Sequence, residues 1–320
     1  MCIRDRWCYI DGEPIQNIDR KRLLVSNWSE LESYLSQDFL KLLYDILKQK
    51  KNGFFFNDFL FFTLGYKIPT AENYETHWQL IKVHKNDIPV IGKKISSGQY
   101  IGKCTSLAIN WGLSKNTSYK RFFGRGKLSD KLTNSKVLII GIGALGSSLA
   151  EILVRGGVKN IYIDDFDIVE TGNLCRANYS LFNINFPKID ALSNRLLSLS
   201  PFVNIQVRQL KINSMSKEVL ENELNKQFDF IFDCSTDPEV SYILDNINFT
   251  GEILSLGLTN NAKHLTCVVG NNIAHETAVL YDCLENEPAS FFEGTGCGYP
   301  TFNANFNDIN TVLNLSLIHI

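Results

Sequence analysis

The stretch GIGALG places Gly141, Gly143 and Gly146 in a G-x-G-x-x-G spacing. The apolar run KVLII precedes these glycines and SSLAEILVRGG follows them, so they lie between an expected strand and an expected helix. In such a turn the first glycine permits the bend, the second lets phosphates approach the backbone, and the third lets the helix pack on the strand. The helix N-terminus then offers N–H groups to a phosphate. The glycines alone fit either a nicotinamide dinucleotide or ATP.

Polar residues downstream of the glycines distinguish these two nucleotides. Asp165, or its neighbour Asp164, lies where an acidic residue usually binds a ribose hydroxyl, about 20 residues past the loop. Arg176 and Lys188 follow, in the segments NLCRANY and FPKIDAL. A nicotinamide enzyme has no need of these cations, whereas AMP transfer to a carboxylate builds negative charge at the α-phosphate, which fixed cations stabilise. The two cations therefore favour ATP.

Taken in order, the motifs from about 120 to 310 resemble the ThiF/MoeB/ubiquitin-activating superfamily. The matching motifs are Asp165-Phe-Asp167, Asn173-Leu-Cys-Arg176, FPKIDAL with Lys188, and Asp233-Cys-Ser-Thr-Asp237. Two positions depart from the family pattern, because Phe186-Pro187 stands where glycine is common before the lysine and Ser235 replaces threonine. The resemblance implies an α/β fold with a Rossmann-like, mostly parallel sheet, helices on both faces, and a smaller α+β domain before it.

The resemblance also implies an activity and the residues that perform it. Members use ATP to adenylate a carboxylate, most often the C-terminal glycine of a ubiquitin-like or sulfur-carrier protein, and release pyrophosphate. The residues implied to hold ATP are Gly141, Gly143, Ala144, Gly146, Asp165, Asp167, Asn173, Arg176 and Lys188. Arg176 and Lys188 are the implied catalytic cations, and Asp237 is the implied Mg²⁺ ligand beside the triphosphate, since Mg²⁺ prefers oxygen ligands.

Two further groups are implied catalytic residues. In RFFGR, Arg125, with Arg121 as second choice, corresponds to an arginine that reaches the partner's γ-phosphate across a homodimer; a basic solvated linker is the alternative. Cys297 in GTGCGYP stands where many members carry the cysteine that accepts the acyl group as a thioester, and its flanking glycines give access. No nearby cation would lower its pKa, so a structural thiol is equally consistent. Zinc is not expected, since the family's C-x-x-C pairs are not present.

Other functions stay open from the sequence. Adenylation of a small molecule, a peptide or a tRNA base keeps the chemistry and changes the substrate, although the net charge of −2 disfavours nucleic acid. A nucleotide-binding scaffold without catalysis is an alternative of another class. A nicotinamide-dependent dehydrogenase leaves the downstream cations unexplained.

Length predicts two domains, and the absence of a signal or membrane span predicts a cytoplasmic protein; the resemblance implies a bacterial one. The 320 residues divide at a linker into an N-terminal domain, 7–115, and an ATP-binding domain, 119–314. The N-terminal domain is either ubiquitin-conjugating-like or a substrate-recognition module. No apolar run is long enough for a membrane span, no secretory signal is visible, and eight scattered cysteines fit reduced thiols. MCIRDR and LSLIHI resemble adaptor read-through, so truncation at both ends is expected.

Hydrophobic patterning predicts the elements that position these residues. Strands are expected at 136–141, 159–165, 204–210, 228–235 and 251–258, and helices at 144–157, 186–201, 216–227 and from 238. This alternation implies a parallel sheet. In the N-terminal domain a helix is expected over 28–50, and the aromatic segment 53–66 is expected to be buried core.

Overall fold

The computed structural model describes residues 7–9, 25–49, 53–69, 73–94, 100–115, 117–208, 212, 215–284, 291–292 and 301–316. The chain forms two compact units, 1–121 and 122–320. No helix among the described residues is both long and apolar enough to cross a bilayer.

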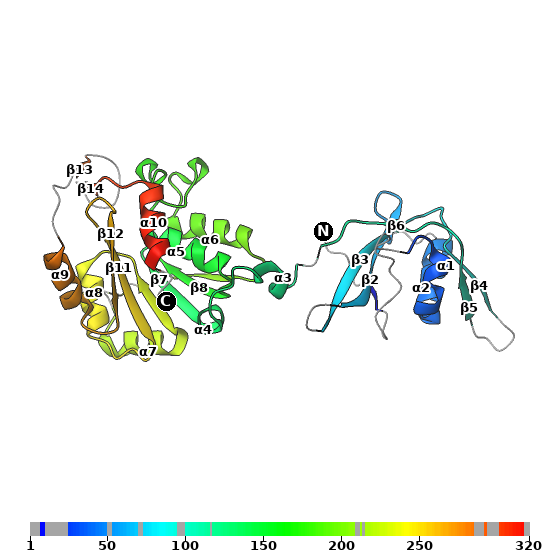
Figure 1. The fold of residues 1–320 in the computed structure, drawn as a ribbon, viewed down its shortest axis with the longest axis horizontal. Helices are drawn as coiled ribbons and strands as arrows, with labels where there is room; N and C mark the ends of the chain where they lie inside the picture. Colours follow the sequence, from blue (N-terminus) through cyan, green and yellow to red (C-terminus); the bar gives the residue numbers. More distant parts are fainter. Residues whose placement is uncertain are drawn as a thin grey trace. The chain divides into compact units, whose positions relative to one another are not determined.

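Unit 1 is an α+β unit built on a four-stranded sheet (Figure 1). The sheet has the order β1 (Trp7–Tyr9), β2 (Phe59–Pro69), β3 (Tyr74–His84) and β6 (Asn110–Trp111). A separate hairpin consists of β4 (Val90–Lys94) and β5 (Tyr100–Cys104). The helical elements are α1 (Trp28–Leu31), the 3-10 turn η1 (Glu32–Tyr34) and α2 (Gln37–Gln49).

The expected helix over 28–50 is interrupted. Leu35 adopts an extended conformation, and the Ser36 hydroxyl accepts a hydrogen bond from the Phe39 N–H at 3.2 Å, so a new helix begins there. The aromatic segment is confirmed as core on one face of β2, where Leu60 and Phe62 are buried, whereas Phe56 before the strand is exposed. Apolar spacing alone therefore missed the serine cap.

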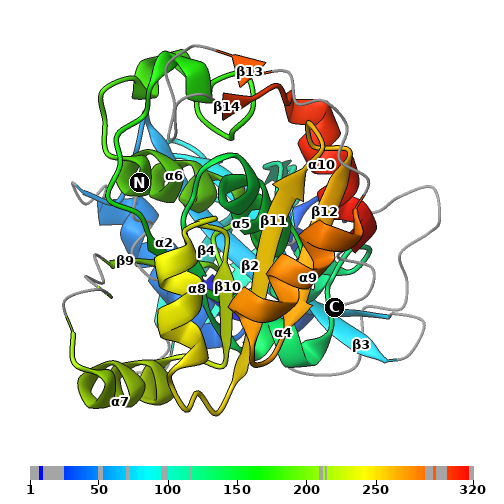
Figure 2. The same cartoon turned by 90° about the vertical axis from the view of Figure 1, so that its left-hand side faces the viewer.

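Unit 2 contains a six-stranded sheet, which confirms the expected α/β architecture (Figure 2). Its order is β12 (His264–Val269), β11 (Glu252–Thr259), β10 (Phe230–Asp233), β7 (Lys136–Ile140), β8 (Asn160–Asp164) and β9 (Asn204–Arg208). Only β12 pairs in the antiparallel sense among these strands. The long helices are α5 (Ala144–Arg155), α6 (Lys188–Leu199), α7 (Lys217–Gln227), α8 (Pro238–Asp245), α9 (Ile273–Cys283) and α10 (Phe306–Ser316). Short elements are α3 (Tyr119–Phe123), at the junction of the units, and, within unit 2, α4 (Asp130–Asn134), η2 (Thr171–Asn173), η3 (Leu181–Asn183), β13 (Phe291–Phe292) and β14 (Thr301–Phe302).

Both faces of this sheet are covered, which explains why β7 is apolar from Val137 to Ile140. Val137 and Ile139 pack into a core formed with α5, α6 and α10. Leu138 and Ile140 point to the opposite face and pack into a second core with α7, α8 and α9. Strands covered on both faces are largely apolar, as is usual in parallel sheets.

The direction of winding of the sheet reverses at β7. From β7 the chain moves to β8 on one side, and later enters β10 on the other side of β7. In open α/β sheets ligands bind outside the carboxyl ends of the strands where the direction of winding reverses. The segments that follow β7 and β10 therefore flank the expected binding site.

Candidate active site

The glycine loop, residues 141–146, leaves β7 through a left-handed turn. Gly141 has φ +77°, and its N–H donates to the Asp164 carbonyl at 2.8 Å. A Cβ at this position would lie 2.6 Å from Ser235 Cα. Glycine is therefore required both by the backbone and by the close approach of the chain that follows β10.

The other two glycines differ in their surroundings. A Cβ on Gly146 would lie 2.0 Å from the Gly141 carbonyl oxygen, whereas a Cβ on Gly143 would meet no atom within 4 Å. Gly143 is the N-cap of α5, and among the described residues no side chain caps the helix there. Open space therefore lies beside the N-cap of α5, as an anion site at a helix N-terminus requires.

Carboxylates and a tyrosine brace the glycine loop from the segment after β8. Asp165 Oδ2 accepts from the Ile142 N–H at 2.9 Å, and Asp165 Oδ1 accepts from the Asp167 N–H at 2.8 Å. The Tyr179 hydroxyl donates to the Ile142 carbonyl at 2.6 Å. Burial, aided by the nearby carboxylates Asp165 and Asp167, raises the pKa of Tyr179, so the hydroxyl stays a donor. Sequence reasoning missed Tyr179, although it lies three residues after the matched arginine.

Lys188 begins α6 and lies close to the acidic segment. Its Nζ pairs with Asp167 Oδ2 at 2.7 Å, and its N–H donates to the Asp167 carbonyl at 2.9 Å. Only 4% of the Lys188 side chain is exposed. This ion pair and the backbone hydrogen bond hold Lys188 in place at the start of α6.

Asn173 and Arg176 belong to the turn around η2. Asn173 is buried, and its Oδ1 accepts from the Glu170 N–H at 2.8 Å, which closes a capping box. The Arg176 N–H donates to the Asn173 carbonyl at 3.2 Å, and the arginine is half-buried. The asparagine therefore fixes the turn that carries the arginine.

The strand-end turn, Cys234–Asp237, follows β10 and contacts the glycine loop at Gly141. Thr236 has φ +57°, an uncommon conformation for a β-branched residue. Asp237 is the exposed N-cap of α8, and its Oδ1 accepts from the Glu239 N–H at 2.9 Å. The turn that contacts the glycine loop thus also carries an exposed carboxylate.

This carboxylate suits Mg²⁺ bound together with phosphates. Among the described residues no group of three or more His, Cys, Asp or Glu side chains could hold a metal by itself. Mg²⁺ needs only one or two protein carboxylates when substrate phosphates complete its octahedron. Asp237 commits one oxygen to α8 and has a second one for a cation, so its donor set fits this role.

The two arginines expected to act across a dimer belong to different units. Arg121 is the last residue of unit 1, where it pairs with Glu75 of β3, with Arg121 Nε 3.2 Å from Glu75 Oε2. Arg125 is exposed in the turn after α3, and no hydrogen bond or ion pair among the described residues ties it to the glycine loop. Cys297 lies outside the described residues.

Five cysteines in the described part of the chain are free thiols that differ in burial, namely Cys104, Cys175, Cys234, Cys267 and Cys283. Burial, and secondarily the charge of Glu32, raises the pKa of Cys104 to about 11. Burial also raises the pKa of Cys234 well above its usual range, whereas Cys175 is exposed. Cys104 and Cys234 are therefore poor nucleophiles.

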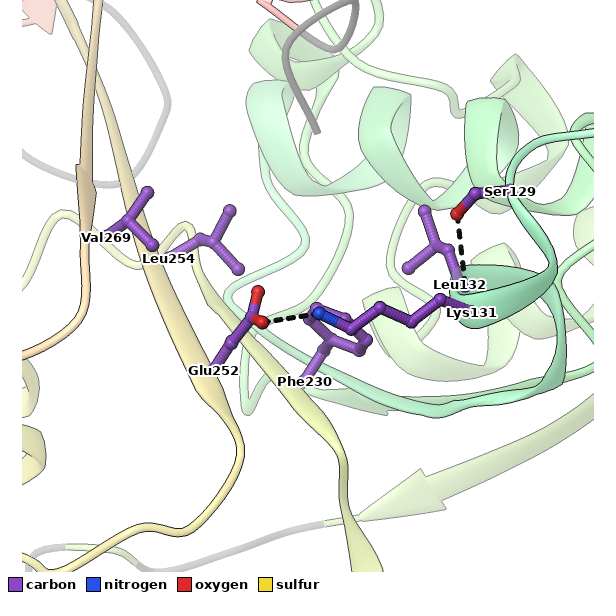
Figure 3. A pocket seen from close by; sticks show the side chains of 7 residues that line it. All are labelled: Ser129, Lys131, Leu132, Phe230, Glu252, Leu254 and Val269. Atoms are coloured by element: carbon purple, nitrogen blue, oxygen red, sulfur yellow. Dashed lines mark hydrogen bonds and ion pairs between the residues drawn. The ribbon is translucent and has the colours of Figure 1, made fainter.

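A concavity of about 140 Å³ lies at the edge of the sheet opposite the glycine loop (Figure 3). It is lined by Ser129, Lys131, Leu132, Phe230, Glu252, Leu254 and Val269. Lys131 Nζ crosses it to reach Glu252 Oε1 at 2.5 Å and lies 5.2 Å from the centre of the Phe230 ring. Phe230 and Glu252 open their strands, so this hollow is at the amino ends, away from the glycine loop.

Comparison with protein families gives a match to the ThiF family over residues 113–297. Among curated relatives, the ATP-dependent ubiquitin transferase-like protein Cap2 of Enterobacter hormaechei is 29% identical over 210 residues, covering 63% of this chain and 35% of Cap2. The molybdopterin-synthase adenylyltransferase of Haemophilus influenzae is 33% identical over 117 residues, covering 36% of this chain and 46% of that protein. The chain thus spans less than half the length of these relatives.

Solved structures resemble the chain more distantly. The structure of E. coli MccB with ATP has 20% sequence identity and a TM-score of 0.41, and the match covers 58% of this chain and 54% of MccB.

Proposed function

The chain belongs to the ThiF family, and from this premise we propose that it uses ATP to adenylate the C-terminal glycine of a ubiquitin-like or sulfur-carrier protein. The relatives' names, ubiquitin transferase-like protein and molybdopterin-synthase adenylyltransferase, support this class of substrate. The observation that carries the proposal is the N-terminus of α5 at Gly143, which has open space beside it, together with the turn after β10, which contacts the glycine loop at Gly141 and carries Asp237.

In the proposed reaction a carboxylate oxygen of the partner attacks the α-phosphorus of ATP. The bond between this phosphorus and the oxygen bridging to the β-phosphate breaks, and pyrophosphate leaves with the electron pair. Negative charge on the α-phosphate oxygens is highest during this exchange, so Arg176 and Lys188 lower the barrier by electrostatic attraction. Mg²⁺, when bound, neutralises phosphate charge, and Asp237 is the residue that would hold it.

The rest of the site orients ATP. N–H groups at the start of α5 bind phosphate oxygens, and Asp165 accepts a hydrogen bond from a ribose hydroxyl. The hydrogen bond from Ile142 to Asp165 leaves capacity for this, since a carboxylate accepts about four. We place Asn173 as the residue that holds the Arg176 turn.

One later step and one contact across a dimer complete the proposal. The Cys297 thiol, as thiolate, attacks the acyl carbon of the adenylate, a thioester forms, and AMP leaves. Arg125 reaches the active site of a partner copy. The free thiols among the described residues fit a reducing cytoplasm, where we expect the protein to act.

A second copy of the chain is the proposed partner for an exposed apolar patch near the active site. The patch consists of Phe166, Ile168, Leu181, Phe182 and Phe186. Phe166 and Phe182 are 92% and 88% exposed, and the Val169 N–H donates to the Phe186 carbonyl at 2.9 Å, which joins the two halves of the patch. Exposed aromatic clusters of this kind mark interfaces, and a symmetric dimer needs a patch that complements itself.

Exchange of labelled pyrophosphate into ATP tests the function, with candidate ubiquitin-like proteins as substrates. We expect exchange with one such protein, loss of more than 100-fold in Asp237→Ala, and exchange without any thioester in Cys297→Ala. If only a peptide or a small carboxylate supports exchange, the substrate is of that class and not a ubiquitin-like protein. ATP binding without exchange would favour a nucleotide-binding scaffold over an enzyme. Loss of exchange in Cys297→Ala would contradict the proposal that Cys297 acts only after adenylation.

A further inference from the structure

Asp233, the last residue of β10, is a buried carboxylate to which the proposed reaction gives no part. It is 1% exposed and accepts four hydrogen bonds. Oδ1 accepts from the Ser235 N–H at 3.0 Å and the Ser235 hydroxyl at 2.6 Å. Oδ2 accepts from the hydroxyls of Ser241 at 3.1 Å and Ser255 at 3.2 Å. Among the described residues no ion pair reaches this carboxylate, so its burial depends on these donors.

The donors come from three elements. Ser235 lies in the strand-end turn, Ser241 in α8 and Ser255 in β11. One carboxylate therefore links the end of β10 to the neighbouring strand and to the helix that Asp237 caps. A network that connects all its members in a buried site fixes one arrangement strongly.

Ser235 connects the Asp233 carboxylate to the backbone of Asp237. The Ser235 hydroxyl has a single proton, which it donates to Asp233, so its oxygen is left to accept from the Asp237 N–H at 3.2 Å. The backbone of Ser235 also touches Gly141, which sets the distance between turn and glycine loop. The left-handed Thr236 lies between the two bonded residues, and such a conformation persists only where its surroundings determine it.

We propose that Asp233 and Ser235 are positioning residues, which hold the Asp237 carboxylate where it meets Mg²⁺ on the phosphates of ATP. This inference rests on the proposed function. It also explains why serine can stand where the family commonly has threonine, since both supply the hydroxyl.

The chain offers matched variants for the test. Ser235→Ala and Ser255→Ala each remove one hydroxyl from the same carboxylate, but only Ser235 also bonds the Asp237 N–H. Ser235→Thr retains the hydroxyl. Calorimetric titration with ATP, in Mg²⁺ buffer and in EDTA buffer, gives the tightening of ATP binding that Mg²⁺ causes, and thermal melting reports stability.

We expect Ser235→Ala to lose at least five-fold of this Mg²⁺-dependent tightening, with ATP affinity in EDTA changed less than two-fold. Ser255→Ala and Ser235→Thr should retain the tightening within two-fold. A merely structural role would lower melting temperature in both alanine variants and leave the Mg²⁺ effect equal, which would overturn the inference. The inference also fails if wild type binds ATP with no Mg²⁺ effect. No ATP binding by wild type in either buffer would instead refute the proposed function.

Discussion

Substitution by alanine should have different effects at Gly143, where α5 begins, and at Gly146, where α5 packs against the glycine loop. Gly146→Ala adds a methyl group 2.0 Å from the Gly141 carbonyl oxygen, whereas Gly143→Ala adds one with no atom within 4 Å. We expect the first variant to lose stability and the second to keep its stability but lose ATP affinity. The contrast separates the structural use of a glycine from its use as an approach path for phosphate.

The size of the Gly146 effect follows from two opposing terms. Alanine is favoured over glycine inside a helix by about 0.5–1 kcal/mol. Overpacking a tight site costs about 1–3 kcal/mol, and the upper part of that range applies because the obstacle is backbone and cannot rotate away. The expected net loss is about 2 kcal/mol, or roughly 4–8 °C in melting temperature for a unit of this size.

The tryptophans provide an internal control for this measurement. All four, Trp7, Trp28, Trp78 and Trp111, belong to unit 1. Tryptophan fluorescence therefore follows unit 1, while far-UV circular dichroism follows both units. Gly146→Ala should lower the melting temperature of unit 2, which is seen by circular dichroism, and leave the fluorescence transition of unit 1 unchanged.

The ATP measurement completes the test. In Gly143→Ala the added methyl occupies the space in front of the first N–H groups of α5, so we expect affinity for ATP to fall at least ten-fold, with melting within 1 °C of wild type. The reasoning is refuted if this variant binds ATP like wild type, or if it is destabilised as much as Gly146→Ala.

Two further predictions concern acid stability and assembly. Burial raises the pKa of Glu151, but hydrogen bonds from Arg195 and Arg155 outweigh this effect, so the pKa in the folded state is lowered overall. The ionised carboxylate therefore stabilises the fold above the pKa of the unfolded state, about 4.3. This stabilisation is lost as pH falls through the lowered pKa of the folded state. Glu151→Gln should therefore cost up to about 1 kcal/mol in urea unfolding at pH 7, since both arginines are partly exposed, and nothing near pH 2; an equal loss at both pH values would contradict this. Phe182→Ser should shift sedimentation toward monomer, whereas Tyr242→Ser, an exposed aromatic on α8 outside the patch, should not; a monomeric wild type would refute the proposed dimer.

The sheet of unit 2 could be predicted because its signals are local. The apolar run KVLII marked β7, and the Gly141 turn followed from glycine spacing, since both depend on neighbouring residues alone. The helix over 28–50 was predicted wrongly as continuous, because apolar periodicity outweighed the capping signal of Ser36.

The bracing of the site could not be predicted, because it depends on strand register. Nothing local to Tyr179 indicates that its hydroxyl reaches the Ile142 carbonyl, and nothing local to Asp233 indicates donors from two other elements. Lys188 was expected to face phosphates, and the structure adds that Asp167 holds it in a nearly covered position. The roles of these residues toward ATP stay predictions.

The bracing of Ile142 has a consequence for how the protein is made. Both polar groups of this residue bond to side chains that the ribosome adds later, Asp165 and Tyr179. A nascent chain that has emerged only through α5 possesses every glycine of the loop but not the two groups that set its shape. Competence to hold a nucleotide therefore arises after the segment beyond β8 folds back, and any shortened version designed to retain it must extend at least that far.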